Sequence, residues 1–300
     1  MTDQEKIYDV AVIGAGPAGI SCALQLKRYG IEPLFFEKQR IGGLLHNANL
    51  VENYPGFPEG LSGPELTDRF KAHLKAQNLA LLYEEVCCVS LRDEVFNIQT
   101  GEADYKAGIL VLASGTCHKK PDIEISAELA VKVFYEVRDL YEQDLQDKKV
   151  IIIGAGDAAF DYALNLAGNS GINEVSILNK SSRTRCIQLL KERAFSNNRI
   201  TYIENTESQR IEGFLNKIKI TCRNGSEFKT DYLLFAIGRQ ACLDFLSPEL
   251  SENKEELQTS KKLFLTGDVK NEMFRQTAIA AGDGLRTAME IYKFLNENQI

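Results

Sequence analysis

The stretch Tyr8-Asp-Val-Ala-Val-Ile-Gly14-Ala-Gly16-Pro-Ala-Gly19-Ile-Ser-Cys-Ala-Leu decides the fold of this chain. The apolar run at 10–13 predicts a buried strand, and Gly-x-Gly-x-x-Gly predicts a tight turn into a helix that ends near residue 29. The first glycine allows the bend, the second lets a pyrophosphate approach the backbone, and the third lets helix and strand pack closely. A strand at 33–36 then ends in Glu37, whose carboxylate can accept hydrogen bonds from ribose hydroxyl groups. The stretch therefore predicts a dinucleotide-binding unit, with the phosphates at the helix N-terminus.

The same pattern recurs at Gly154-Ala-Gly156-Asp-Ala-Ala159, between a predicted strand at 150–153 and a predicted helix at 160–167. Two such units imply two dinucleotides, each with its own domain. The next strand, at 174–178, ends not in an acid but in Asn179-Lys180-Ser-Ser-Arg183-Thr-Arg185. Lysine and arginine can donate charge-assisted hydrogen bonds to a 2′-phosphate, which favours NADPH over NADH. The alternative interpretation is a solvated basic loop.

Composition excludes several classes of protein. The net charge of −7 argues against nucleic-acid binding, and 300 residues with 44% hydrophobic content suit two domains. The segment 1–6 is polar, and no apolar run reaches the length of a membrane span, so we expect a cytoplasmic protein without a membrane partner. The three histidines and seven scattered cysteines suggest neither a metal site nor a disulfide framework, and no Cys-x-x-Cys occurs.

The rest of the chain supplies further elements. We expect a loop at 51–58, a helix at 63–75, antiparallel strands at 81–92 and 95–100, and a strand at 106–113. Adjacent Cys87-Cys88 is interpreted as part of a buried strand, with a vicinal redox pair as the alternative. Strands at 218–221 and 232–236 close the second unit. A strand from 263 runs into Gly267-Asp268, where a carboxylate could bind a polyol such as the ribityl chain of a flavin, and a helix from 276 to 295 follows.

These motifs, with Gly42-Gly43, Val51-Glu-Asn-Tyr-Pro-Gly-Phe-Pro58, Ala236-Ile-Gly238 and Arg275-Gln276, resemble the thioredoxin reductase branch of the flavin-dependent pyridine-nucleotide oxidoreductases. The resemblance implies FAD in the first unit, a nicotinamide cofactor in the second, and a homodimer. It also implies an α/β fold of two Rossmann-like, three-layer ββα domains. The FAD domain is then discontinuous, at 1–116 and 245–300, and the NAD(P)H domain covers 117–244.

The predicted binding residues come from these motifs. Those for FAD are Gly14, Gly16, Pro17, Ala18, Gly19, Glu37, Gly43, Leu44, Asn53, Val86, Gly115, Gly267, Asp268, Arg275, Gln276 and Thr277. Those for NADPH are Gly154, Gly156, Asp157, Ala158, Lys180, Arg185 and Gly238. We assign no catalytic acid or base, because a flavin carries the chemistry itself.

The sequence departs from the family pattern at three places. The family's Cys-x-x-Cys, counted back from Gly154, falls at Val137 and Leu140, where no thiol is available. Leu44 replaces the family's glutamine, and the basic motif is kept only at Lys180 and Arg185. The stretch Phe134-Tyr-Glu-Val-Arg-Asp-Leu140 resembles instead the thioredoxin-reductase-like ferredoxin–NADP reductases, which also lack the cysteines.

The leading hypothesis is an FAD-dependent oxidoreductase that passes electrons between NADPH and a second carrier, ferredoxin or flavodoxin. Lys119-Lys120 and the region 183–193 are the candidate basic contacts for such an acidic carrier. One alternative is a thiol–disulfide enzyme that uses Cys117, whose pKa His118 and the two lysines could lower, although a structural cysteine is the simpler interpretation. The other alternative is a flavin-bound electron-transfer or sensor protein that does not use NAD(P)H.

Overall fold

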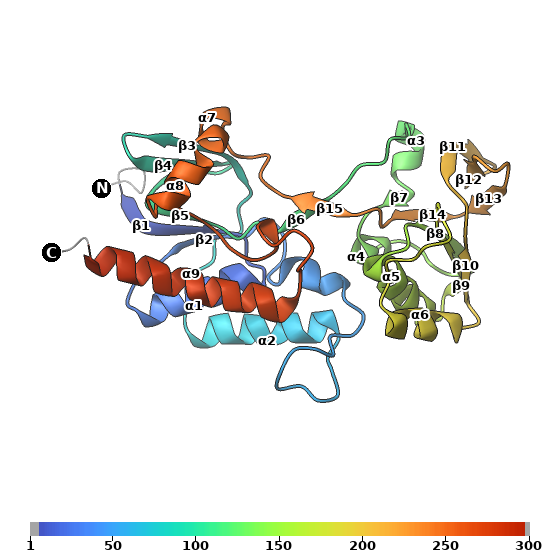
Figure 1. Ribbon diagram of the computed structural model, residues 1–300, viewed down its shortest axis with the longest axis horizontal. Helices are drawn as coiled ribbons and strands as arrows, with labels where there is room; N and C mark the ends of the chain where they lie inside the picture. Colours follow the sequence, from blue (N-terminus) through green and yellow to red (C-terminus); the bar gives the residue numbers. More distant parts are fainter. Residues whose placement is uncertain (1–5, 298–300) are drawn as a thin grey trace. The chain divides into compact units, whose positions relative to one another are not determined.

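The computed structural model describes residues 6–297, which fold into two compact units (Figure 1). The first unit contains the chain up to His46, Val51–Cys117 and the chain from Gln240 onward, so it is discontinuous in the sequence. The second contains Asn47–Leu50 and His118–Arg239. Residues 1–5, which carry most of the polar N-terminal segment discussed above, lie outside the described residues.

The first unit is built on a parallel sheet with the strand order β2-β1-β5-β16. A second layer consists of helices, in which α9 lies alongside α1 (Figure 1). The third is an antiparallel extension in which β4 pairs with β5 and β3 with β4. The bounds are β1 Ile7–Ile13, α1 Pro17–Arg28, β2 Leu34–Phe36, η2 Gly43–Asn47, α2 Gly63–Ala76, β3 Val86–Arg92, β4 Val95–Thr100, β5 Asp104–Leu112, β6 Thr116–His118, α7 Pro248–Glu252, α8 Lys254–Thr259, β16 Leu263–Leu265, η3 Gly267–Val269 and α9 Thr277–Glu297.

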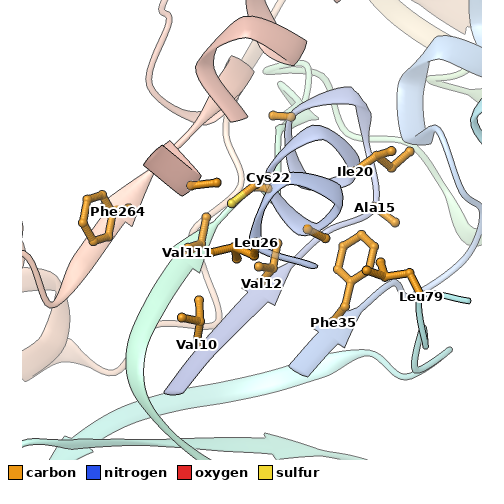
Figure 2. Packing of buried hydrophobic residues seen from close by; sticks show 14 of the residues in the cluster. Val10, Val12, Ala15, Ile20, Cys22, Leu26, Phe35, Leu79, Val111 and Phe264 are labelled. Carbon is orange, nitrogen blue, oxygen red and sulfur yellow. The ribbon is translucent and has the colours of Figure 1, made fainter. Parts of the chain in front are cut away.

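Strand β1 separates the two apolar cores of this unit because successive side chains of a strand point to opposite faces. Val10 and Val12 pack in the helical layer, and Figure 2 shows them beneath Cys22 and Leu26 of α1. The alternate residues of β1 instead join the core formed with β3 and β4. All of these β1 residues from Val10 onward are buried, which explains the continuous apolar run in the sequence.

The second unit repeats this architecture. Its parallel sheet has the order β10-β9-β8-β14-β7. Helices α4, α5 and α6 contribute to the core on one face, and the antiparallel sheet β11-β12-β13 packs with α3 on the other. The bounds are α3 Ala127–Ala130, β7 Val133–Phe134, α4 Val137–Leu140, β8 Lys148–Ile153, α5 Asp157–Ala167, β9 Ile172–Leu178, α6 Gln188–Phe195, β10 Ile200–Ile203, β11 Ser208–Phe214, β12 Lys217–Cys222, β13 Glu227–Thr230 and β14 Tyr232–Phe235. Strand β15, Arg239–Ala241, leads from this unit back into the first. The predicted α/β fold with Rossmann-like domains is therefore confirmed.

Two local predictions for the first unit were wrong. The strand expected at 81–92 begins only at Val86, because Leu82 instead forms an isolated bridge with Phe36. Cys87 is exposed and Cys88 half-buried, so the pair is not a buried apolar segment. The pairing of β3 with β4 shifts register between Val86 and Cys88, and this irregularity places Cys87 at the surface.

Candidate functional site

The first glycine turn can be formed only by glycine at two of its positions. Gly14 has a φ of +103°, and a Cβ there would lie 2.5 Å from the carbonyl oxygen of Ala113. A Cβ at Gly19 would lie 1.9 Å from the carbonyl oxygen of Gly14, so α1 packs directly against the turn. The Gly14 N–H donates to Phe36 O at 2.9 Å, which holds the turn against β2.

Gly16 differs because the space beside it is open. A Cβ built at Gly16 meets no atom within 4 Å, although one built at Gly43 would come within 3.7 Å of Gly16 Cα. Gly16 is the N-cap of α1, and Pro17 and Ala18 follow in the first turn, where backbone N–H groups lack helical partners. This open cradle at a helix N-terminus suits a pyrophosphate.

Glu37 is buried directly after β2 and anchors the turn. Its Oε2 accepts from the Ala15 N–H at 2.8 Å, and its Oε1 accepts from Gln39 N at 2.9 Å and Arg40 N at 3.2 Å. A carboxylate has about four acceptor positions. Glu37 can therefore hold the turn and still accept from a ribose hydroxyl group.

The C-terminal segment returns to the same turn. Gly267 has a φ of +74°, and a Cβ there would lie 2.6 Å from Ala18 Cβ, so η3 and its Asp268 pack against the start of α1. Ahead of α9, Gln276 Oε1 accepts from Asn53 Nδ2 at 2.9 Å, which ties the loop at 51–61 to this helix. Thr277 is the first residue of α9.

Arg275 carries a buried donor atom that has no partner within the described residues. Of the buried side-chain nitrogen and oxygen atoms within residues 6–297, only Arg275 Nε and Thr266 Oγ1 have no hydrogen-bond partner. A buried guanidinium donor left without an acceptor is costly, so this atom fits a negatively charged ligand. Open Gly16, buried Glu37 and this unpaired nitrogen are the features of the first unit that would fit a dinucleotide such as FAD.

The remaining predicted FAD residues are Leu44, Val86 and Gly115. Leu44 is half-buried in η2 beside Gly43, and Val86 is buried at the start of β3. Gly115 adopts a φ of +65° between β5 and β6. Their roles stay predictions from the resemblance.

The second glycine turn has the same geometry as the first. Gly154 has a φ of +131°, its N–H donates to Leu178 O at 3.1 Å, and a Cβ there would lie 2.2 Å from Ala236 O. Gly156 is again open, with no atom within 4 Å of a built Cβ. Asp157 and Ala158 begin α5 and are exposed, so this helix also offers a cradle to phosphates.

The basic loop after β9 is fastened to this turn. Arg185 N donates to Ala155 O at 3.0 Å, and Ile187 N donates to Asp157 Oδ1 at 2.8 Å. Lys180, Arg183 and Arg185 are exposed, and none of them pairs with a carboxylate of the described chain. These cations are therefore available to an anionic ligand near the second turn.

Gly238, the last predicted NADPH residue, leaves β14 with a φ of +115°. Its carbonyl accepts from Lys119 N at 3.0 Å. The glycine therefore holds the returning chain in place where the second unit ends.

The sequence did not reveal a polar network in the second unit. Glu136 Oε1 pairs with Arg239 Nη1 at 2.5 Å, and these side chains are only 16% and 20% exposed. Glu136 Oε2 accepts from Asn47 Nδ2 at 3.0 Å and from the Tyr162 hydroxyl at 3.1 Å. Burial, followed by the nearby Glu136 charge, raises the pKa of Tyr162, so the phenol stays protonated as a donor. The sequence separation of 103 residues between Glu136 and Arg239 left no local signal for this pair.

This network immediately precedes the two positions counted for the family's cysteines. Val137 and Leu140 are completely buried in α4 and belong to the core of the second unit. Val137 and Leu140 are therefore packing residues, and neither could take part in thiol–disulfide exchange.

Cys117 lies in β6, half-buried, with its Sγ 4.0 Å from Ala241 O. His118 is not positioned as its base, because neighbours in a strand point to opposite faces. The His118 ring stacks on Tyr135 with ring centroids 3.8 Å apart. Burial lowers the pKa of His118, with Glu136 opposing that effect, which disfavours the cationic ring that the prediction invoked.

Within residues 6–297, no helix is both long enough and apolar enough to cross a bilayer. The same residues contain no group of three or more His, Cys, Asp or Glu side chains suited to a metal ion.

Two glycine turns at helix N-termini, one in each three-layer unit, define a protein with two Rossmann-like domains. Residues 8–284 match the family described as pyridine nucleotide-disulphide oxidoreductase, and the chain belongs to this family.

Curated relatives and solved structures agree with this assignment. The thioredoxin reductase of Mycolicibacterium smegmatis is 27% identical over 314 residues, covering 99% of each chain. That of Treponema pallidum is 29% identical, covering 98% of this chain and 99% of the relative. The crystal structure of Lactococcus lactis thioredoxin reductase superposes with a TM-score of 0.85 at 25% identity, covering 97% of this chain and 99% of that one. The predicted likeness to thioredoxin reductases is thus confirmed, whereas closeness to ferredoxin–NADP reductases stays a prediction.

Proposed function

We propose that this protein is an FAD-dependent oxidoreductase that passes electrons between NADPH and a second carrier without a Cys-x-x-Cys disulfide. The observation that carries the proposal is the segment 137–140, where the cysteines were expected. It is a short helix in which both of those positions, Val137 and Leu140, are completely buried apolar residues, and the sequence has no Cys-x-x-Cys elsewhere. A dithiol relay needs one sulfur to attack and a second to resolve the mixed disulfide. Without that motif, a bound flavin would have to pass electrons to the second carrier without a protein dithiol between them.

The first unit supplies the groups that would hold FAD. Gly16 and Gly43 leave room for the pyrophosphate, Glu37 accepts from the ribose, and Arg275 offers an unused donor. When bound, FAD supplies hydride transfer with the nicotinamide and single-electron exchange with other carriers. The N-terminus of α9 at Thr277 contributes positive potential that favours an anionic reduced ring.

The second unit supports NADPH in preference to NADH. The loop that carries Lys180 and Arg185 is fastened to the glycine turn by the hydrogen bonds of 155 and 157 described above. Its cations have no internal counter-ion and could bind a 2′-phosphate.

Ferredoxin or flavodoxin is the proposed second carrier. Both are usually acidic, and exposed Lys119 and Lys120 with the region 183–193 could meet such a surface. The relatives compared above are named for thioredoxin instead, so direct reduction of a disulfide is the second candidate function.

A homodimer is proposed as the assembly. Helix α9 exposes Leu285, Met289 and Tyr292, which share one face and are 44%, 51% and 38% exposed. An apolar stripe on a solvent-facing helix marks a surface for association. Light scattering after size-exclusion chromatography should give twice the monomer mass, and Met289→Glu should reduce it.

The decisive experiment is anaerobic stopped-flow reduction of the purified yellow protein. We expect NADPH to bleach the flavin faster than NADH, and ferredoxin or flavodoxin then to restore the oxidised spectrum. Restoration by oxidised thioredoxin alone would support the second candidate. Failure of both nicotinamides to bleach the flavin would support the remaining alternative, a flavin-bound electron-transfer or sensor protein that does not use NAD(P)H. A colourless protein that cannot take up FAD would overturn all three.

A further inference from the structure

Two cysteines lie on the segments by which the chain leaves the first unit and returns to it. Cys117 is in β6, and Cys242 directly follows β15, which pairs with β6 in a two-stranded sheet. The two thiols are close enough for Cys117 to contribute to the raised pKa of Cys242. We propose that Cys117 and Cys242 form a thiol–disulfide exchange site that reduces low-molecular-weight disulfides by closing an intramolecular disulfide.

The strand register explains why the two thiols meet. Cys242 N donates to Gly115 O at 3.1 Å, and Lys119 N donates to Gly238 O at 3.0 Å. These antiparallel bonds put Cys242 opposite Gly115, and they put Cys117 opposite Gln240. The two cysteines are therefore diagonal neighbours on one face of the strand pair. Gly115 has no side chain, and a Cβ built there meets no atom within 4 Å, so the neighbouring face is open.

The geometry also predicts a bond that is easily reduced. Diagonal residues lie about 7–8 Å apart, whereas a disulfide prefers Cα atoms within roughly 7 Å. Closing it must draw two short strands, of three residues each, slightly together. A bond formed under such strain is labile, so an excess of the small disulfide is needed to drive its formation, and an added thiol reopens it easily.

The pair is accessible as well as adjacent. Cys117 and Cys242 are both partly exposed, as are Cys88 and Cys186, whereas Cys22 and Cys222 are buried. Burial, together with Cys117 and Asp244, raises the pKa of Cys242, and Lys38 opposes this effect. Cys242 therefore stays protonated at neutral pH and suits the resolving position, which leaves Cys117 as the attacking thiol.

The exchange balances without any other cofactor. The Cys117 thiolate attacks one sulfur of a disulfide RSSR, the S–S bond breaks, and the leaving thiolate takes up the proton that Cys117 lost. Cys242 then loses its proton and attacks Cys117 Sγ, which releases the second RSH. Two thiols are oxidised by two electrons, and RSSR is reduced to two RSH. The site therefore stands independently of the proposed flavin function.

Oxidised glutathione is a suitable probe for the full-length, pre-reduced protein. After incubation, free thiols are alkylated and the protein is mapped without reduction. We expect two fewer alkylated thiols per chain, a peptide cross-link between Cys117 and Cys242, and recovery of both thiols with dithiothreitol. Cys242→Ser should instead accumulate glutathione on Cys117, because the resolving thiol is gone. Cys87→Ser is the matched control, since it removes an exposed cysteine and should leave the cross-link unchanged.

Several results would overturn the proposal. They are full alkylation of both cysteines, a stable glutathione adduct on the unaltered protein, a cross-link through Cys87 or Cys88, or a disulfide between two chains. Flavin reduction by NADPH, measured in Cys117→Ser and Cys242→Ser, separates the two hypotheses. If these variants lose the cross-link while NADPH still bleaches their flavin, the thiol pair does not take part in flavin reduction. If NADPH fails to bleach the flavin of the unaltered protein, only the proposed flavin function is contradicted.

Discussion

Asn179 holds in the second unit the position that Glu37 holds in the first. Each follows the strand beside a glycine turn, and their N–H groups donate to Ile203 O and Leu82 O, both at 2.9 Å. Glu37 turns its carboxylate to the Ala15 N–H of its own glycine turn. The Asn179 amide instead donates to Arg183 O at 3.1 Å and to the Tyr202 hydroxyl at 2.8 Å. The second unit thus replaces a negative charge with a neutral group that shapes a basic loop.

The neutral Asn179, in place of an acid such as Glu37, predicts that the second unit selects the phosphorylated nicotinamide. Arg185→Ala should raise the KM for NADPH roughly 10-fold or more, because a hydrogen bond to a charged partner contributes about 1.5–3 kcal/mol. The KM for NADH, which has no 2′-phosphate, should change little. Steady-state kinetics with both nucleotides checks this, and Lys229→Ala, at an exposed lysine of β13, is the control. An equal rise in the KM of both nucleotides would show that Arg185 maintains the shape of the loop and does not recognise the phosphate.

Glu37 should matter for stability as well as for FAD. Glu37→Ala leaves three backbone N–H groups without their acceptor, which should lower the free energy of unfolding of the first unit by about 2–3 kcal/mol. Glu37→Gln should cost less, because its remaining oxygen can still serve Gln39 and Arg40. Urea unfolding and the FAD content per chain measure both effects. Equal stability of the two variants would contradict the hydrogen-bonding role.

The glycine turns could be predicted from the sequence because their signal is local. A buried strand, a spaced set of glycines and a helix lie within one short stretch, as at Gly14 and Gly154. The contacts of Glu136 with Arg239, and of Cys117 with Cys242, depend on chain segments more than 100 residues apart. No periodicity encodes such pairings. The exposure of Cys87 likewise follows from a shift in strand register, which single-sequence alternation cannot reveal.

Gly284 tests the close packing of α9 on α1. A Cβ at this position would lie 1.9 Å from Ala18 O, which is backbone and cannot turn aside. Gly284→Ala should therefore separate the helices, destabilise the first unit by about 1–3 kcal/mol and lower FAD retention. Gly282→Ala, in the same helix, is the matched control because its Cβ would meet nothing within 4 Å. That variant should gain up to about 1 kcal/mol from helix propensity. Thermal unfolding compares the two, and equal melting temperatures would refute the packing argument.

Asp161 predicts a specific pH dependence of the second unit. Burial raises its pKa to about 6, although its Oδ2 accepts from Asn49 N at 3.0 Å, and Asp157 adds a smaller like-charge effect. Because this pKa lies above the value in an unfolded chain, the folded state binds the proton more tightly between about pH 4 and pH 6. Ionisation of Asp161 should therefore reduce stability as the pH rises through that window. Asp161→Asn keeps an acceptor for Asn49 and removes the charge. The variant should match the unaltered protein near pH 4 and exceed it by about 2 kcal/mol at pH 7, measured by urea unfolding. A difference that does not vary with pH would show that the carboxylate is solvated in the folded protein.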